Sequence, residues 1–414
     1  MRIAAVFLGA ALLGCSFQPQ GTQFDDPDAG DDVGGGDGGP TADGFRPVDA
    51  RPTPDAMPGS PDARPWPSIA HVAAGDEVGL ASTVDWNITT DTRIDTSDGS
   101  IRYGTTIPAG VVIKPVAQEG GGPDLLIVYA ANIRVSANVE LLARGPRALV
   151  LAAAGEIAVD GEVDGSAGRL QDGSMEPGPA GAGPGQGPGA GAGGASSQGY
   201  DSGGGGGGFG QAGAEGGASQ RGPRTAAGTS YGDAQLTVLE GGSGGGNASP
   251  CRQGGAGGGA VQLSAGALVL VNGFVHVGGA GGDGGTQCPG NNGGSGGGGG
   301  SGGGLYLEAP QVDGTGVLGC NGAGGGGSGC ACFGSGSDNG QAGGDAFAGP
   351  SIALGGRGQQ SGDGGDGAAG AVAAERGTSA TNGGGGGGGA GRIAIASPSI
   401  GGGLTASPGF TAVP

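Results

Sequence analysis

The chain has little lysine, few aromatic residues and little charge. Lys114 is its single lysine, 4% of its 414 residues are aromatic and 13% are charged, and its formal net charge is -20. No basic stripe is available to neutralise phosphates, so nucleic acid is excluded as a partner. The single lysine does not follow a glycine, which excludes a P-loop. The negative charge is instead typical of a soluble exported surface.

The chain also lacks an apolar run long enough to cross a bilayer, which takes about 20 residues. The run from Ile3 to Leu13 is about half that length and follows Arg2, as in a signal sequence. It ends in Leu12-Leu13-Gly14-Cys15, which resembles the lipobox of bacterial lipoproteins. The resemblance implies a signal peptide over 1–14, lipidation of Cys15 and membrane attachment through acyl chains. Ser16 follows Cys15 in place of Asp, which resembles the sorting pattern of enteric lipoproteins and implies the outer membrane. We therefore expect a lipid-anchored envelope protein.

Cysteines and histidines are also few. Beyond Cys15, the candidate disulfide cysteines all lie in the glycine-rich half: Cys251, Cys288, Cys320, Cys330 and Cys332. Export permits disulfides, and five cysteines predict two bridges and one free thiol, with the pairing left open. Cys330 and Cys332 lack zinc-site spacing and the two histidines are isolated, so no metal and no cofactor is predicted.

Residues 15–67 form a segment of Asp, Pro and Gly with almost no apolar side chains, which predicts a disordered tether. At 68–124 the composition changes, and Val84, Trp86 and Ile88 begin an alternation of β-formers. This predicts an N-terminal β segment. No later stretch has a helical period with caps, so the remainder, 125–414, is also expected to be β.

An internal repeat is the most informative feature of 125–414. Each copy starts with three residues at every second position, of which the first two are apolar and the third is small. The copies are Ile127, Tyr129, Ala131; Leu149, Leu151, Ala153; Val261, Leu263, Ala265; Leu305, Leu307, Ala309; Ile393, Ile395, Ser397. In the second, third and fourth copies a turn follows, with Asx-Gly at 160–161, 272–273 and 313–314, and Asn138 occupies the equivalent place in the first. We align Ile133 with Ile157 and Val139 with Val163, each 24 residues apart.

Two architectures fit this repeat. Asx-Gly pairs are common in β-hairpins, but strands of about three residues are too short for a stable isolated hairpin. Stacked turns of a solenoid would share one core. The copies resemble the repeats of parallel β-helix surface proteins such as filamentous-haemagglutinin-type adhesins, which implies an all-β, irregular parallel β-helix with long glycine-rich insertions.

Those insertions, roughly 169–259, 278–304 and 319–391, carry most of the chain's 113 glycines. Flexible loops, or a solvated brush that never folds, are the ordinary interpretation, because ordering glycine costs the most backbone entropy. The alternative is that neighbouring tracts pack side by side as polyproline-II-like strands joined by hydrogen bonds. The tracts also resemble glycine-repeat surface proteins of the PGRS type.

Motifs for catalysis are weak. Gly-x-Ser-x-Gly occurs around Ser243 and Ser295, but glycine density makes that match a matter of chance, and no helix follows. The segment Gly334–Asn339 approaches a calcium-binding β-roll repeat. The loop aspartates are candidate calcium ligands: Asp283, Asp338, Asp345, Asp363 and Asp366. Candidate carboxylates for polysaccharide cleavage are Asp160, Glu162 and Asp164 beside Arg169, and Asp313 near Glu308.

The sequence therefore predicts a non-enzymatic structural or adhesive envelope protein, with no catalytic residues assigned. Its expected partners are the membrane, through the lipid, and a surface glycan or matrix ligand. The alternative is a carbohydrate-binding or polysaccharide-cleaving β-helix, which would show a carboxylate cluster with a basic residue in one groove.

Overall fold

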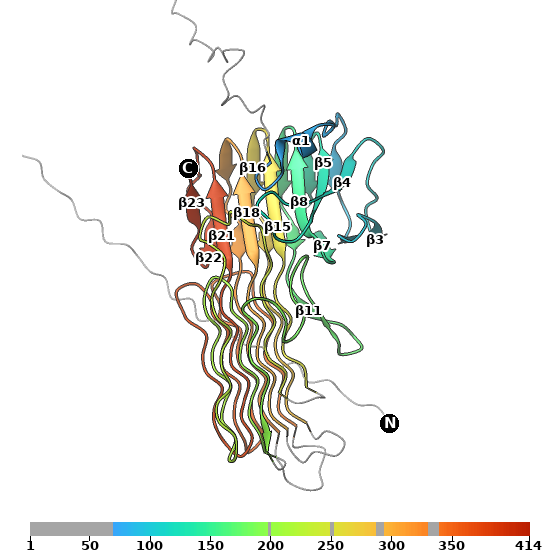
Figure 1. Cartoon of the computed structure of the whole chain (residues 1–414). Coiled ribbons are helices and arrows are strands. Elements are labelled where there is room, and N and C mark those ends of the chain that lie inside the picture. The colour runs from blue at the N-terminus through green and yellow to red at the C-terminus, as the bar shows by residue number, and fades with distance from the viewer. Residues whose placement is uncertain (1–68, 198–199, 249–251, 287–293, 330–338) are drawn as a thin grey trace, which may run out of the picture. The chain divides into compact units, whose positions relative to one another are not determined.

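A computed structural model describes residues 69–197, 200–248, 252–286, 294–329 and 339–414 (Figure 1). The predicted signal peptide, the tether and Cys15 lie outside the described residues. Helix is limited to α1 (Ala74–Glu77), and no helix of the described ranges is long and apolar enough to cross a membrane. All other regular secondary structure in the described residues is β-strand, which confirms the predicted all-β class.

Three sheets contain nearly all the strands, and their neighbours are mostly parallel. Sheet I is ordered β1 (Trp86–Ile88), β6 (Ile133–Val135), β9 (Glu156–Val159), β16 (Leu268–Val271), β19 (Gln311–Asp313). Sheet II is ordered β22 (Thr405–Ser407), β20 (Val317–Gly319), β17 (Phe274–His276), β10 (Glu162–Asp164), β7 (Glu140–Arg144), β2 (Thr92–Asp95), β3 (Ile101–Tyr103). Sheet III is ordered β23 (Thr411–Val413), β21 (Arg392–Ala396), β18 (Gly304–Glu308), β15 (Ala260–Ala265), β8 (Ala148–Ala153), β5 (Leu125–Ala130), β4 (Val112–Val116).

The chain visits the sheets in a fixed order, from III to I to II, in four successive units that begin at β5, β8, β15 and β18. At one edge of sheets II and III, β3 and β4 pair antiparallel with their neighbours, so these two sheets are mixed. Two small antiparallel pairs lie apart: β11 (Gly168–Arg169) with β12 (Met175–Glu176), and β13 (Ser196–Ser197) with β14 (Tyr200–Asp201).

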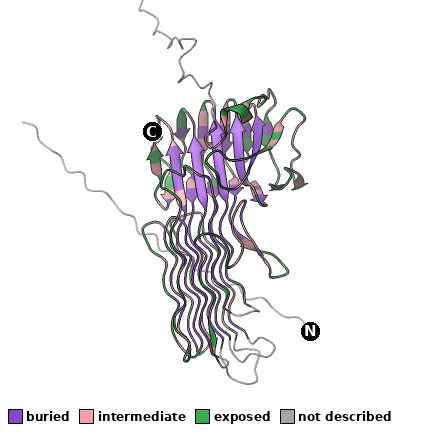
Figure 2. Ribbon diagram, in the orientation of Figure 1, coloured by how far each residue is buried: buried purple, intermediate pink, exposed green. Residues whose placement is uncertain are grey.

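The inward residues of all three sheets form one core. Leu151 of sheet III, Ile157 of sheet I and Val163 of sheet II belong to the same fully buried cluster. A second cluster covers the outer face of sheet III, where Ile69 and Val72 pack with Leu236 and Leu239. The central strands of sheet III are therefore buried on both faces (Figure 2).

The repeat alignment is confirmed for four copies and wrong for the first. Val261 pairs with Leu149 and with Leu305 as predicted. In β5, however, Leu126 and not Ile127 pairs with Leu149, because a strand buried on both faces gives no alternation from which its register can be read. Ile133 pairs with Ile157, but Val163 pairs with Leu141 instead of Val139.

The Asx-Gly pairs lie at the turns between sheets I and II. A positive φ accounts for the glycine in few of these pairs. Asn138 (φ 60°) and Gly314 (φ 131°) are left-handed, and neither Gly161 nor Gly273 is. A Cβ on Gly161 would overlap the carbonyl oxygens of Ser136 and Val139 instead. Close stacking of successive turns is the reason for glycine there.

The glycine tracts run side by side and lead directly into the strands of sheet III (Figure 1). Within the tract 294–304, amides three residues apart donate to one neighbour: Gly296, Gly299 and Gly302 to the carbonyls of Gly383, Gly386 and Gly389. The amides of Gly297 and Gly300 donate to a second tract, those of Gly298 and Ser301 to a third, and carbonyls of 294–304 accept from three more. A period of three with no internal hydrogen bonds matches polyproline II.

These tracts are buried and tightly packed. All residues of 294–304 are buried, as are those of 203–208 and 382–391 (Figure 2). A Cβ at most of these glycines would overlap a carbonyl oxygen of a neighbouring tract. In the described residues the tracts follow the alternative of packed, hydrogen-bonded strands, and the ordinary interpretation as flexible loops is wrong for them.

Candidate functional site

The outer face of sheet II carries a groove lined by carboxylates. Two hollows of about 390 and 370 Å³ share Glu162 and Phe274. Glu140, Glu162 and Phe274 occupy one register position on neighbouring strands, and Asp164 and His276 occupy a second. The alternation of the strands puts Val163 into the core and leaves both rows outside.

The two rows are linked by hydrogen bonds. His276 Nε2 lies 2.6 Å from Glu162 Oε1 and 3.8 Å from Asp164 Oδ1. Asp164 accepts hydrogen bonds from the amide (2.6 Å) and the hydroxyl (2.5 Å) of Ser166. Phe274 is 46% exposed beside these polar groups, an arrangement suited to a ligand with both a polar edge and an apolar face.

Burial separates the protonation states of these acids. Burial, assisted by the charges of Asp164 and Glu162, raises the pKa of Glu140 to about 7. Burial alone would raise the pKa of Asp164, but His276, Arg144 and Ser166 hold it below its ordinary value. Burial likewise opposes the charge on His276, yet its bond to Glu162 and the nearby carboxylates raise its pKa. The pKa values of the two acids are thus shifted in opposite directions, with Glu140 in the lining of the groove and Asp164 buried beside His276.

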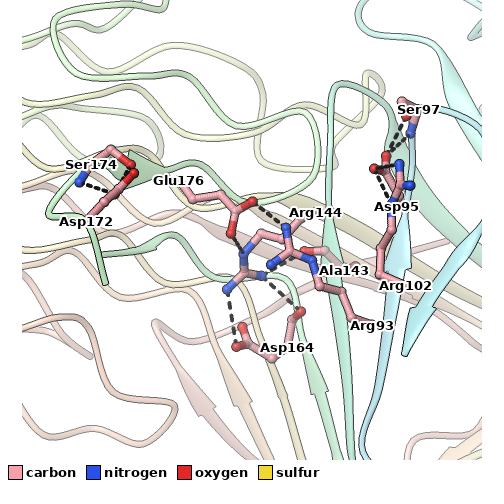
Figure 3. A network of polar contacts seen from close by, with 10 residues as sticks. All are labelled: Arg93, Asp95, Ser97, Arg102, Ala143, Arg144, Asp164, Asp172, Ser174 and Glu176. Atoms are coloured by element: carbon pink, nitrogen blue, oxygen red, sulfur yellow. Dashed lines mark hydrogen bonds and ion pairs between the residues drawn. The ribbon is translucent and has the colours of Figure 1, made fainter. Parts of the chain in front are cut away.

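Arginines anchor one end of this cluster (Figure 3). Arg144 lies 3.6 Å from Asp164 and 3.6 Å from Glu176 of β12, and Arg93 donates to Glu176 at 2.5 Å. Glu176 comes from the β11–β12 hairpin, which the first glycine insertion places against sheet II. These ion pairs leave little free positive charge at the cluster.

The structure unites some of the predicted candidates and separates others. Glu162 and Asp160 line the groove, although Asp160 is held by Asn272 (2.9 Å) and Arg134 (2.6 Å). Asp164 is buried and does not belong to the lining. The expected grouping of Arg169 with these carboxylates is wrong. Arg169 forms an ion pair with Asp283, and Arg144 forms the ion pair with Asp164. Sequence patterns do not indicate Glu140, Glu176 or His276 as partners, because Glu140 reaches Glu162 only in the observed register of β7 and the other two come from distant strands.

Asp313 and Glu308 lie on different sheets. Asp313, at the end of β19, accepts the amide of Gly314 at 2.7 Å, which is a turn role. Glu308, on the outer face of sheet III, accepts hydrogen bonds from Ser264, Gln262 and the amide of Ala70. The sequence did not indicate that the segment at Ala70 would return to cover this face.

In the described residues, the aspartates that are candidate calcium ligands accept hydrogen bonds from backbone amides of the glycine tracts. Asp345 accepts the amide of Gly281, Asp363 that of Gly358 and Asp366 that of Gly355, at 2.6 to 2.7 Å. Asp338 lies outside the described residues. No group of three or more His, Cys, Asp or Glu suited to a metal ion occurs in the part of the chain that the structure describes.

Of the candidate disulfide cysteines, Cys320 is described, and it is a free, fully buried thiol. Cys251, Cys288, Cys330 and Cys332 lie outside the described residues. Ser243 and Ser295, from the chance Gly-x-Ser-x-Gly matches, are buried in glycine tracts.

No protein-family model matches the chain, and neither a curated protein nor a solved structure matches it.

Proposed function

We propose that the chain is a non-enzymatic structural or adhesive protein of a bacterial envelope, carried by lipid on Cys15 and displaying an irregular parallel β-helix. The observation that carries the proposal is the packing of the glycine tracts. Three long insertions form a buried, hydrogen-bonded array and not loops around an active site. Such an array resists deformation and suits display or coating better than turnover.

The repeated order of strands supports the β-helix. Four units follow the order III, I, II with in-register parallel pairing, and their inward residues share one core. Each glycine insertion begins after a strand of sheet II and ends before the next strand of sheet III. The insertions therefore extend successive units at the same corner and leave the stacking of the units undisturbed.

Limited proteolysis with mass spectrometry tests the display function. We expect one resistant fragment that begins near Ile69 and retains all three glycine insertions, with a far-UV circular dichroism spectrum free of helix. Cleavage throughout 169–259 and 319–391 would overturn the proposal. Labelling with a fatty-acid analogue, compared between wild type and Cys15→Ala, tests the anchor separately: equal incorporation would refute lipidation.

Carbohydrate binding is a second candidate function, favoured by the groove of sheet II. Phe274 offers an apolar ring, and Glu140, Glu162 and Asp160 offer hydrogen-bond partners for hydroxyl groups. The lining is acidic, so neutral or amino sugars fit better than uronic acids. This differs from the acidic glycans that a basic groove would select.

A glycan array followed by titration tests this candidate. Phe274→Ala and Glu162→Gln should each weaken binding by about tenfold. Phe410→Ala removes another exposed ring, far along the chain on neither wall of the groove, and serves as the matched control. Binding that survives both groove variants would refute the assignment, and release of shorter sugars would identify a cleaving enzyme.

A further inference from the structure

A separate hollow of about 400 Å³ lies on the outer face of sheet III. Its principal walls come from β18, β21, β23 and the corner after β21: Tyr306, Glu308, Ala309, Ala396, Pro398 and Val413. Most of this lining is apolar. Its polar side chains are Ser397, Glu308 and Tyr306, and the last two are largely buried, at 5% and 6% exposed.

Glu308 is satisfied on one oxygen only. Its Oε1 accepts hydrogen bonds from Ser264 Oγ (2.5 Å), the amide of Ala70 (2.9 Å) and Gln262 Nε2 (3.0 Å). Within the described ranges, Oε2 receives no hydrogen bond and Glu308 forms no ion pair. The carboxyl group is thus fixed in place while one oxygen is left to the hollow.

The surroundings hold this geometry. His71 Nδ1 bonds Gln262 Oε1 at 2.8 Å, and His71 Nε2 lies 2.5 Å from the carbonyl of Leu236. These contacts fix the amide of Gln262 toward Glu308. The ring of Tyr306 packs edge-on against His71 at 4.8 Å between centroids, and its hydroxyl makes no hydrogen bond within the described residues.

A largely buried carboxylate without a neutralising charge beside it is costly. Burial accordingly raises the pKa of Glu308 to about 7, against the effect of its three donors. A ligand that brings a positive charge, together with a donor for the accessible Oε2, would remove that cost. The apolar walls would at the same time favour a ligand with a hydrocarbon body.

We infer that this hollow is a binding site for a small organic cation, a primary ammonium group on a short apolar chain. The ammonium donates to Glu308 Oε2 and to the Tyr306 oxygen, and the chain packs against Ala396, Pro398 and Val413. Calcium is a poorer fit because it takes six to eight oxygen ligands, and the side chains that line the hollow offer one carboxylate, one phenol and the hydroxyl of Ser397.

Ligand-observed NMR titration of the full chain with n-butylammonium tests the site. Saturable binding is expected, with neutral butyramide about tenfold weaker and butyrate not bound. Glu308→Gln should weaken butylammonium binding by about tenfold or more, and Tyr306→Phe by a few-fold. Glu156→Gln, a carboxylate on sheet I, is the matched control and should leave the titration unchanged.

Three results would overturn the inference. One is the absence of saturable binding, a second is equal affinity for butyramide and butylammonium, and the third is competition by Ca²⁺, which would indicate a metal site. If Glu308→Gln does not fold, the Tyr306→Phe variant and the comparison of butylammonium with butyramide still test the inference. None of these results bears on the display function, which depends on the glycine tracts, or on the groove of sheet II.

Discussion

The Cα of Gly298 faces the carbonyl oxygen of Gly205 so closely that no methyl group fits between them. The amide of Gly298 meanwhile donates to the carbonyl of Gly246 at 3.0 Å. One residue thus contacts two tracts, through N–H and through Cα–H, and the second contact is available only when there is no side chain. Glycine is required here by proximity, since Gly298 is not a positive-φ residue.

Gly298→Ala is therefore expected to destabilise the chain. The added methyl group must push two tracts apart or break their hydrogen bonds, and overpacking of this kind costs about 1–3 kcal/mol. Urea unfolding followed by far-UV circular dichroism would measure the loss.

Gly349→Ala is the matched control. A Cβ at Gly349 meets nothing within 4 Å, and its φ is not left-handed. The substitution should be neutral, or stabilise by about 0.4–1 kcal/mol through the unfolded state. Equal effects of the two variants would refute close packing as the reason for glycine at Gly298.

The fold could be predicted from the sequence where one face of a strand differs from the other. Val261, Leu263 and Ala265 are separated by Gln262 and Ser264, so their register was readable. The run Leu125–Ala130 is apolar throughout because sheet III is covered on both faces, and its register was missed by one residue. The tracts posed another problem, since glycine has the same sequence signature whether it is solvated or packed.

Hydrogen exchange should distinguish packed tracts from solvated ones. Amides of 296–304 and 383–389 donate to carbonyls of other tracts, so they should exchange as slowly as those of β8 and β15. Exposed Gly402 and Gly409 provide an internal reference for fast exchange. Exchange of the tracts at the rate of Gly402 would show that the array does not persist in solution.

The sites were harder to predict, because their members come from distant parts of the chain. Ala70 lies 238 residues before Glu308, and Arg93 lies 83 before Glu176. Both contacts depend on segments that fold back over a sheet, and apolar periodicity carries no information about that. Glu162 and Asp164 could be picked out as outward residues of a strand, but their true partners, Glu140 and His276, required the register.

Stability should fall between about pH 4.5 and pH 7 in part through Glu308. Its pKa rises from 4.5 to about 7 on folding, so the proton favours the folded state below that range, and the contribution is lost as pH rises through 7. The loss is on the order of 3 kcal/mol at most. Urea midpoints of wild type and Glu308→Gln, measured across this range, should diverge in favour of the variant as pH rises. Parallel curves would assign the pH dependence to other groups, of which Glu140 is the first to test.

Cys320 should be unreactive in the folded chain. It is fully buried, and burial raises the pKa of its thiol well above the ordinary value, so little of the reactive thiolate forms. Its Sγ donates weakly to the carbonyl of Arg392 at 3.4 Å, and its amide donates to Ser407. Iodoacetamide should therefore modify Cys320 only after denaturation, as measured by peptide mass spectrometry.

The same measurement tests the predicted bridges. If Cys251, Cys288, Cys330 and Cys332 form two disulfides, denaturation without reductant should expose one thiol per chain in a Cys15→Ala background, and that thiol should be Cys320. The expectation rests on export and on the odd number of cysteines, to which the structure adds that Cys320 is enclosed in the core. Five thiols would show that the glycine array needs no covalent bridges, and would leave its hydrogen bonds and close contacts as the source of its order. Labelling of Cys320 in the native chain would contradict the burial itself.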